Sequence, residues 1–201
     1  MIEIIVTDLG KVLLPFDTGP PMARLRAAAP ECDHLRSVFQ RLWAEADLGK
    51  GASDPKEFHR KLAAETGLRL SYEEFCRDWS DMFEEDGATI GLIMHAPVRE
   101  RHVLSNTNAI HWDWILSRHG EMLGKFDRCW VSHEMRLEKP DPEIYRQVIA
   151  ATGLPPAQHV FIDDIAENVR AAEAVGMAGI VHTDATSLAP ALKAIGLSVP
   201  D

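Results

Sequence analysis

The sequence predicts an α/β fold: a Rossmann-like doubly wound parallel sheet with an inserted all-helical segment. Two observations support this prediction. After residue 87, short apolar runs alternate with helical patterns, which is typical of parallel strands whose connecting helices cover both faces of a sheet. Between residues 20 and 86, apolar residues recur at a spacing of three to four and indicate helices without strands.

The first predicted strand is the buried apolar run IEIIVT at residues 2–7. An isolated strand would leave its backbone groups without partners, so we expect this run to join the sheet formed later in the chain. The later strands are predicted at residues 102–104, 129–131, 159–162 and 178–182.

The helical segment contains two recognisable helix starts. Ser53 or Asp54 precedes Pro55 at a first helical position, and Ser71 followed by Glu74 fits a capping box. Aromatic residues recur at helical spacing in this segment and are predicted to form its own core: Trp43, Phe58, Phe75, Trp79 and Phe83.

Composition excludes several classes of protein. The 201 residues carry 21 Lys and Arg against 31 Asp and Glu, a net charge of −10, so nucleic acid is not an expected partner. No apolar run approaches the roughly 18 residues that span a bilayer, and no signal peptide pattern is present, so no membrane association is expected. The three cysteines lack Cys-x-x-Cys spacing, which fits a reducing compartment. We therefore expect a cytoplasmic protein, either a monomer or a homodimer.

Polar side chains follow the predicted strands. In open parallel sheets, ligand-binding residues gather beyond the carboxyl ends of the strands. Taken singly, each polar residue also fits a structural role; Asp164 with Glu167, for example, matches a helix N-cap. Their occurrence together favours a binding site made of Asp8, Ser105, Asn106, Lys139, Asp163 and Asp164.

The segments DLGKVL, VLSNTN, LEKPDPEIY and FIDDIAENV resemble, in this order, the four motifs of the haloacid dehalogenase-like hydrolase superfamily. The resemblance implies a catalytic core of residues 1–18 and 87–201, and a helical cap domain of residues 19–86. DLG in place of Asp-x-Asp, LSNTN followed by His111, and LSYEEF in the cap are similar to the bacterial subgroup that contains alpha-D-glucose-1-phosphate phosphatase.

This resemblance implies roles for the acidic residues. Asp8 would be the nucleophile and would form an aspartyl-phosphate that water then hydrolyses. Asp8, Asp164 and the backbone carbonyl of Gly10 would hold Mg²⁺, a hard cation that prefers oxygen ligands. Asp163 is expected to act through metal-bound water and not as a direct ligand.

The remaining motif residues imply a phosphate site. Ser105 and the backbone N–H of Asn106 would bind phosphoryl oxygens, and Lys139 would neutralise Asp8 and a transferring oxygen. The expected activity is therefore Mg²⁺-dependent hydrolysis of a small phosphorylated metabolite, with a sugar phosphate such as a hexose 1-phosphate as one candidate.

Gly10 stands where most phosphatases of this superfamily have an acid that protonates the leaving oxygen. Lys11 is an alternative proton donor, although adjacency in sequence does not establish hydrogen-bond reach. His111 and His133 are assigned no catalytic role. The turn at residues 47–53 around Lys50 is predicted to face the substrate.

Two other functions are consistent with the same motifs. A 2-haloacid dehalogenase uses the same nucleophile without a metal, and Asp164 beside the site disfavours it. A weakly catalytic binding protein would explain Gly10, but the joint presence of Asp8, Ser105, Lys139 and Asp164 disfavours it.

Overall fold

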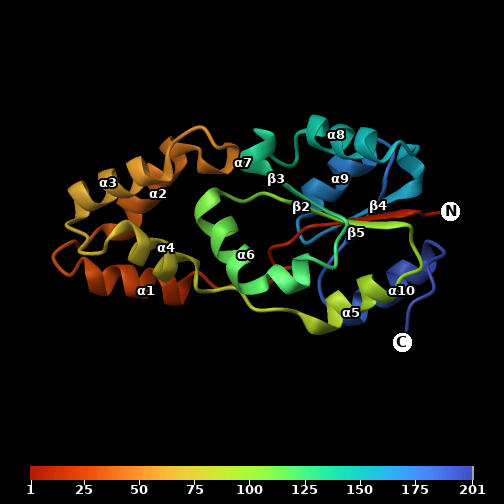
Figure 1. Ribbon diagram of the computed structural model, residues 1–201, viewed down its shortest axis with the longest axis horizontal. Coiled ribbons are helices and arrows are strands. Elements are labelled where there is room, and N and C mark those ends of the chain that lie inside the picture. Colours follow the sequence, from red (N-terminus) through yellow and green to blue (C-terminus); the bar gives the residue numbers. More distant parts are fainter. Residues whose placement is uncertain (201) are drawn as a thin grey trace.

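The computed structural model describes residues 1–200 and contains a five-stranded, all-parallel sheet in the order β3-β2-β1-β4-β5 (Figure 1). Strand β1 is central, β2 and β3 follow on one side of it, and β4 and β5 lie on the other side. The predicted doubly wound α/β fold is confirmed. The strands are β1 (Ile4–Thr7), β2 (Glu100–Ser105), β3 (Arg128–Val131), β4 (His159–Asp163) and β5 (Ala178–Val181).

Helices cover both faces of the sheet because successive strand residues point to opposite sides. Ile5 on β1 joins a core cluster beneath α5, α6 and α10, whereas Ile4 and Val6 join a second cluster beneath α8 and α9. The helices of this part of the chain are α5 (Gly87–His95), α6 (Ala109–Leu123), α7 (Ser132–Met135), α8 (Pro142–Thr152), α9 (Ala166–Ala174) and α10 (Ala185–Ala194), with a 3₁₀ turn at η2 (Pro156–Gln158).

Four helices inserted between β1 and α5 form a separate layer, at the left of Figure 1. They have their own apolar cluster, in which Phe58, Leu62 and Phe75 are buried. The predicted helix starts are present: Asp54 accepts a hydrogen bond from the Lys56 N–H, and the Ser71 capping box forms. The elements of this helical unit are α1 (Gly19–Ala28), α2 (Leu35–Ala46), η1 (Leu48–Lys50), α3 (Pro55–Thr66) and α4 (Tyr72–Ser80).

The two segments that join the helical unit to the sheet run side by side. Glu84 N–H donates to the Pro15 carbonyl at 3.1 Å, and Asp86 N–H donates to the Leu13 carbonyl at 2.9 Å. The rings of Phe16 and Phe83 meet edge to face, with centroids 5.6 Å apart. These contacts fix the helical unit over the carboxyl end of β1.

Among residues 1–200, no helix has the length and apolar character needed to span a bilayer.

Candidate active site

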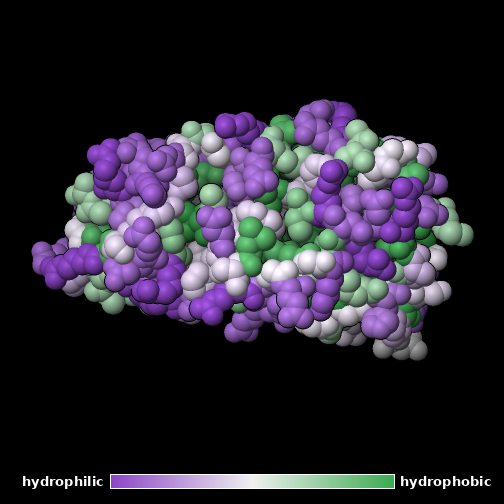
Figure 2. Space-filling model, in the orientation of Figure 1, coloured by the Kyte–Doolittle hydropathy of each residue, from purple (hydrophilic) through white to green (hydrophobic). Residues whose placement is uncertain are grey.

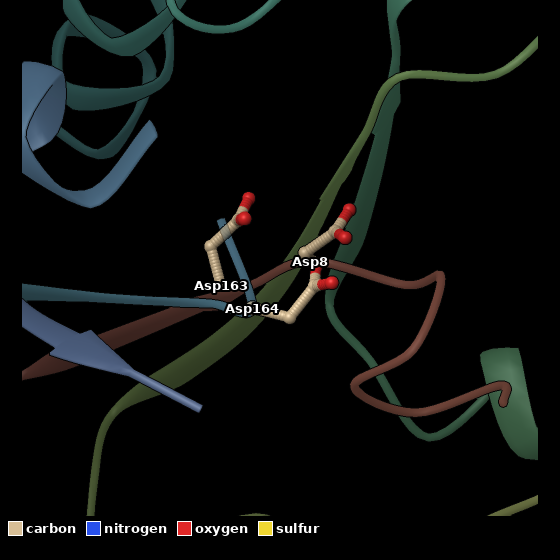
Figure 3. Close-up of side chains that lie close together, drawn as sticks. All are labelled: Asp8, Asp163 and Asp164. Carbon is tan, nitrogen blue, oxygen red and sulfur yellow. The ribbon is translucent and has the colours of Figure 1, made fainter. Parts of the chain in front are cut away.

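Three carboxylates meet at the carboxyl ends of the neighbouring strands β1 and β4 (Figure 3). Asp8 directly follows β1, Asp163 is the last residue of β4, and Asp164 comes next. One oxygen of each carboxylate lies within 4.8 Å of the others. Because β1 and β4 are paired in parallel, their ends coincide, and acids 155 positions apart in the chain become neighbours.

Lys139 joins two of these acids. Its Nζ donates hydrogen bonds of 2.7 Å to Asp8 Oδ1 and of 2.7 Å to Asp163 Oδ2, and its side chain is 1% exposed. The Asn106 side chain holds the lysine backbone: Nδ2 donates to the Lys139 carbonyl and Oδ1 accepts from the Lys139 N–H. Both ends of the amide are therefore used to position the lysine, a role that the sequence did not indicate.

Protein donors surround the Asp163 carboxylate. Its Oδ1 accepts from the Ile165 N–H at 2.8 Å, and Asn168 Nδ2 lies 3.1 Å from each oxygen. With Lys139 on Oδ2, this buried side chain is committed to protein contacts and holds the lysine beside Asp8. Asn168 was not among the predicted site residues. The signal in the sequence was its position in the first turn of α9, shortly after the two acids at the end of β4.

The alternative structural role for Asp164 is wrong. Helix α9 begins at Ala166 after Ile165, without a side-chain cap. Asp164 is half-buried beside Asp8, and Glu167 does not complete a capping box with it.

The cluster has an excess of negative charge. Burial raises the pKa of Asp8 to about 6, opposed by Lys139 and reinforced by Asp163. Burial also raises the pKa of Asp164, and the Asp163 carboxylate adds to the effect. Three carboxylates face one buried ammonium, so a divalent cation would relieve the repulsion, and an all-oxygen donor set suits Mg²⁺. The residues present therefore fit the predicted metal.

Two adjoining cavities open at this end of the sheet. The smaller, of about 190 Å³, contains Asp8, Lys139 and Asp164 on its wall. The larger, of about 450 Å³, lies between the helical unit and the sheet. Both cavities have Gly10, Phe16, Ser105 and Asn106 on their walls, so the larger one adjoins the cavity that contains Asp8.

Phe16 occupies the space in front of Gly10. A Cβ built on Gly10 would lie 3.0 Å from Phe16 Cε1, which leaves little room for a larger residue. Lys11 is exposed on the wall of the smaller cavity, with its Nζ 5.6 Å from the centre of the Phe16 ring. An aromatic ring thus packs where a carboxylic acid would otherwise project.

The aromatic residues of the helical unit divide into two groups. Phe58 and Phe75 are buried in its core, as predicted. Trp79 is buried in the same cluster and Trp43 packs against it, as predicted, and both also lie on the wall of the larger cavity. Phe83 lies on this wall too but packs against the core cluster of the sheet, so the prediction is wrong for Phe83. Periodicity identifies a buried face but does not separate packing residues from cavity walls.

The predicted substrate-facing turn also reaches this cavity, through Asp47, Leu48 and Gly49. Lys50 instead approaches Glu138, with Nζ 4.0 Å from Oε2. His111 is buried on the cavity wall, and its Nδ1 lies 3.1 Å from Ser80 Oγ. Burial lowers the pKa of His111 to about 4, so the ring is neutral near pH 7 and is a poor proton donor.

Comparison with known proteins agrees with this geometry. Residues 94–176 match the family described as haloacid dehalogenase-like hydrolase. The chain is also 30% identical to the sesquiterpene phosphatase astK of Aspergillus oryzae, over 94% of this chain and 93% of the relative.

The chain belongs to the haloacid dehalogenase-like hydrolase family.

Other members of the haloacid dehalogenase-like hydrolase family are similar over most of their length. The D-ribitol-5-phosphate phosphatase of Bacteroides thetaiotaomicron is 26% identical, covering 88% of this chain and 89% of that enzyme. A Porphyromonas gingivalis protein, described as a predicted HAD-like family hydrolase, has 26% identity and a TM-score of 0.80, covering 97% of this chain and 98% of that one.

A HAD family enzyme of Bacteroides thetaiotaomicron, in complex with magnesium and inorganic phosphate, has a TM-score of 0.77 at 23% identity. The match covers 92% of this chain and 96% of that one, and shows a shared fold. The sequence resemblance to the haloacid dehalogenase-like superfamily is confirmed, whereas the glucose-1-phosphate phosphatase subgroup stays a prediction.

Proposed function

We propose that this phosphoric monoester hydrolase cleaves a small phosphorylated metabolite with Asp8 as its nucleophile and Mg²⁺ as its cofactor. The observation that carries the proposal is the buried contact of Lys139 with Asp8, beside Asp164 on the wall of the smaller cavity. Two relatives named as phosphatases, which act on D-ribitol 5-phosphate and on a sesquiterpene phosphate according to their names, support it.

In the proposed reaction an Asp8 oxygen attacks phosphorus while the ester oxygen departs with the bond electrons. Water then hydrolyses the aspartyl-phosphate, releasing inorganic phosphate and restoring Asp8. Lys139 holds Asp8 Oδ1 and therefore orients the carboxylate for attack. Its ammonium group also offsets charge on the transferring phosphoryl group, and such preorganised groups commonly give the largest catalytic effect.

Asp8, Asp164 and the Gly10 carbonyl are assigned as the residues that hold Mg²⁺. When bound, the cation supplies charge neutralisation and alignment of the phosphoryl group. Asp163 is assigned a positioning role, because its carboxylate is committed to Lys139, Asn168 and a backbone N–H.

Ser105 and the Asn106 N–H are assigned to the phosphoryl oxygens. Ser105 is buried at the end of β2, and its side chain lies on the wall of both cavities. Asn106 contributes twice, since its side chain also holds Lys139 in place.

We also propose that residues 19–86 act as a cap domain over a core of residues 1–18 and 87–201. The larger cavity lies between these two parts, and Leu48 and Trp43 of the helical unit face it. A cap in this place would exclude water from the reacting phosphate and contact the organic part of the substrate. The subgroup resemblance makes a hexose 1-phosphate one candidate substrate.

Hydrolysis of p-nitrophenyl phosphate with Mg²⁺, and after removal of divalent cations by a chelator, tests this function. We expect turnover that the chelator abolishes and that Mg²⁺ restores. A parallel assay with 2-chloropropionate, without metal, tests the dehalogenase alternative. Chloride release without phosphate release would reject the proposal, as would phosphate release that the chelator does not affect.

A further inference from the structure

The larger cavity has an aromatic wall. Phe39 and Trp43 stack with ring centroids 5.2 Å apart, and Trp79 lies 4.5 Å from Phe39 and 5.8 Å from Trp43. Phe16, Met82 and Phe83 extend this apolar surface toward the nucleophile. A volume of about 450 Å³ is within the range of small-molecule sites. In Figure 2, hydrophobic residues show at the centre of the molecular face, over α6 and between the helical unit and the sheet.

Several polar groups on this wall are already paired within the protein. Both ends of the Asn106 amide hold Lys139, and Asn108 Oδ1 accepts from the His111 N–H. His111 Nδ1 is paired with Ser80 Oγ, and Ser132 Oγ accepts a hydrogen bond from the Thr107 N–H. The aromatic part of the wall, at Phe39, Trp43 and Trp79, offers few hydrogen-bonding groups, so sugar hydroxyls placed against it would lose hydration without replacement.

The apolar wall continues to the reacting end of the site. Leu9 and Gly10 directly follow Asp8, and both lie on the wall of the larger cavity. Ser105, proposed to bind the phosphoryl group, lies on the walls of both cavities. The two cavities therefore adjoin at the residues proposed to bind the phosphoryl group, so the organic part of a bound ester can extend into the apolar cavity.

We propose that the substrate is a phosphate monoester of an apolar alcohol or phenol, whose hydrocarbon part occupies the larger cavity against Phe39, Trp43 and Trp79. This inference rests on the proposed phosphatase function and names its substrate class. Gly10 and Phe16, which are packed together, continue the apolar wall of this cavity toward Asp8.

A series of para-alkylphenyl phosphates tests this substrate class. Phenyl, ethylphenyl, butylphenyl and hexylphenyl phosphates have similar leaving groups and differ in apolar length. Each methylene that is buried is expected to raise kcat/KM by about three- to fourfold, until the cavity is filled. Glucose 1-phosphate is expected to react with a kcat/KM below that of butylphenyl phosphate.

Two matched tryptophan variants locate the effect. Trp43→Gln removes apolar surface from the cavity and is expected to reduce the ratio of kcat/KM for hexylphenyl to phenyl phosphate by about tenfold. Trp114→Gln changes a tryptophan that lies on neither cavity wall and packs against Arg118, so it is expected to leave the ratio unchanged.

The outcomes separate this inference from the proposed function. Equal kcat/KM values across the alkyl series, or a preference for glucose 1-phosphate, would overturn the apolar substrate while leaving the phosphatase in place. Equal ratios in wild type and Trp43→Gln would also overturn it. If none of the esters were hydrolysed in the presence of Mg²⁺, the proposed function itself would be rejected.

Discussion

Lys139 is the residue on which the charge balance of the acidic cluster depends. It lies between Asp8 and Asp163, and its side chain is almost completely buried. The Lys139 ammonium group also lies 5.4 Å from the centre of the Phe161 ring. Removing one member of a buried ion pair is costly because the partner charge is left uncompensated. In this protein two carboxylates would lose that partner.

Lys139→Ala is therefore expected to lower kcat by roughly 10²- to 10³-fold, the usual loss when one positioned electrostatic group is removed. Steady-state kinetics at saturating Mg²⁺ measure this effect. Lys125→Ala, at an exposed lysine that precedes the amino end of β3 and lies on neither cavity wall, serves as the control and is expected to behave as wild type. An increase in KM alone would make Lys139 a substrate tether and not a stabiliser of the transition state.

His111 gives a prediction for stability. Its folded-state pKa of about 4 lies below the ordinary value of 6.5 because the ring is buried. Between these values the unfolded chain binds a proton that the folded protein does not. The stabilisation from a neutral His111 is therefore complete above the unfolded-state pKa and is lost as the pH falls toward the folded-state pKa.

We expect His111→Asn to remove this part of the pH dependence of the free energy of unfolding. Urea denaturation of wild type and variant between about pH 4 and pH 7.5 measures the difference. His159 and His182, whose pKa values are also lowered by burial, are common to both proteins and cancel in the comparison. Parallel stability curves would show that His111 does not contribute in this way.

Residues at strand ends were predictable, and their supporting residues were not. Asp8, Ser105 and Asp164 follow runs that are recognisable as buried strands, and parallel pairing brings such positions together. Asn106 and Phe16 act through contacts that depend on side-chain direction: the amide reaches Lys139 across 33 positions, and the ring turns back onto Gly10. Hydrophobic periodicity contains no information about either contact.

At the scale of elements, the turn at η1 attaches the helical unit to the sheet. Ser132 Oγ donates to the Gly49 carbonyl at 2.7 Å. A Cβ on Gly51 would lie 2.4 Å from the His133 carbonyl oxygen, so the two backbones are too close for any side chain there. The turn holds one wall of the larger cavity in place over Ser105 and Asn106.

Gly51→Ala tests whether this attachment matters for catalysis, and Gly67→Ala is its matched control. Both glycines have positive φ, 61° and 68°, but only Gly51 faces another backbone, since nothing lies within 4 Å of a Cβ on Gly67. Each variant is expected to lose about 1 kcal/mol of stability from the left-handed conformation. Only Gly51→Ala is expected to lower kcat/KM. Equal kcat/KM values for the two variants would show that the contact is structural only.

The elements themselves followed from local signals. Each predicted strand lies within a residue or two of its observed position, because buried runs of four to six residues bounded by polar residues are distinctive. The cavity between the helical unit and the sheet could not be predicted, because it depends on how the joining segments at Phe16 and Phe83 pair.

At the scale of the whole molecule, the doubly wound order makes the site from distant parts of the chain. Strand β1 lies between β2 and β4 in the sheet, although α1–α5 separate β1 from β2 in sequence, and α6, β3, α7 and α8 separate β2 from β4. The site residues at the carboxyl ends of these strands are therefore brought together only in the folded protein and not in the unfolded chain. Any cation held there stabilises the folded protein relative to the unfolded chain.

Mg²⁺ is accordingly expected to raise the melting temperature of the wild type. At about 100 times the dissociation constant the stabilisation is about 2.7 kcal/mol, which corresponds to several degrees for a chain of this length. Asp164→Asn is expected to weaken the effect, whereas Asp33→Asn, at a side chain that is 98% exposed, retains it. Thermal denaturation at matched ionic strength measures both. A full Mg²⁺ response in Asp164→Asn would place the cation elsewhere.

The central claim is that Asp8 attacks phosphorus, and kcat of Asp8→Asn tests it most directly. The amide preserves the volume of the side chain and is a poor nucleophile, so the fold is retained and turnover of p-nitrophenyl phosphate with Mg²⁺ is expected to fall by a factor on the order of 10³ or more. A folded variant, shown by an intact cooperative melting transition, that keeps about a tenth of the wild-type kcat or more would contradict the assignment of Asp8 as nucleophile.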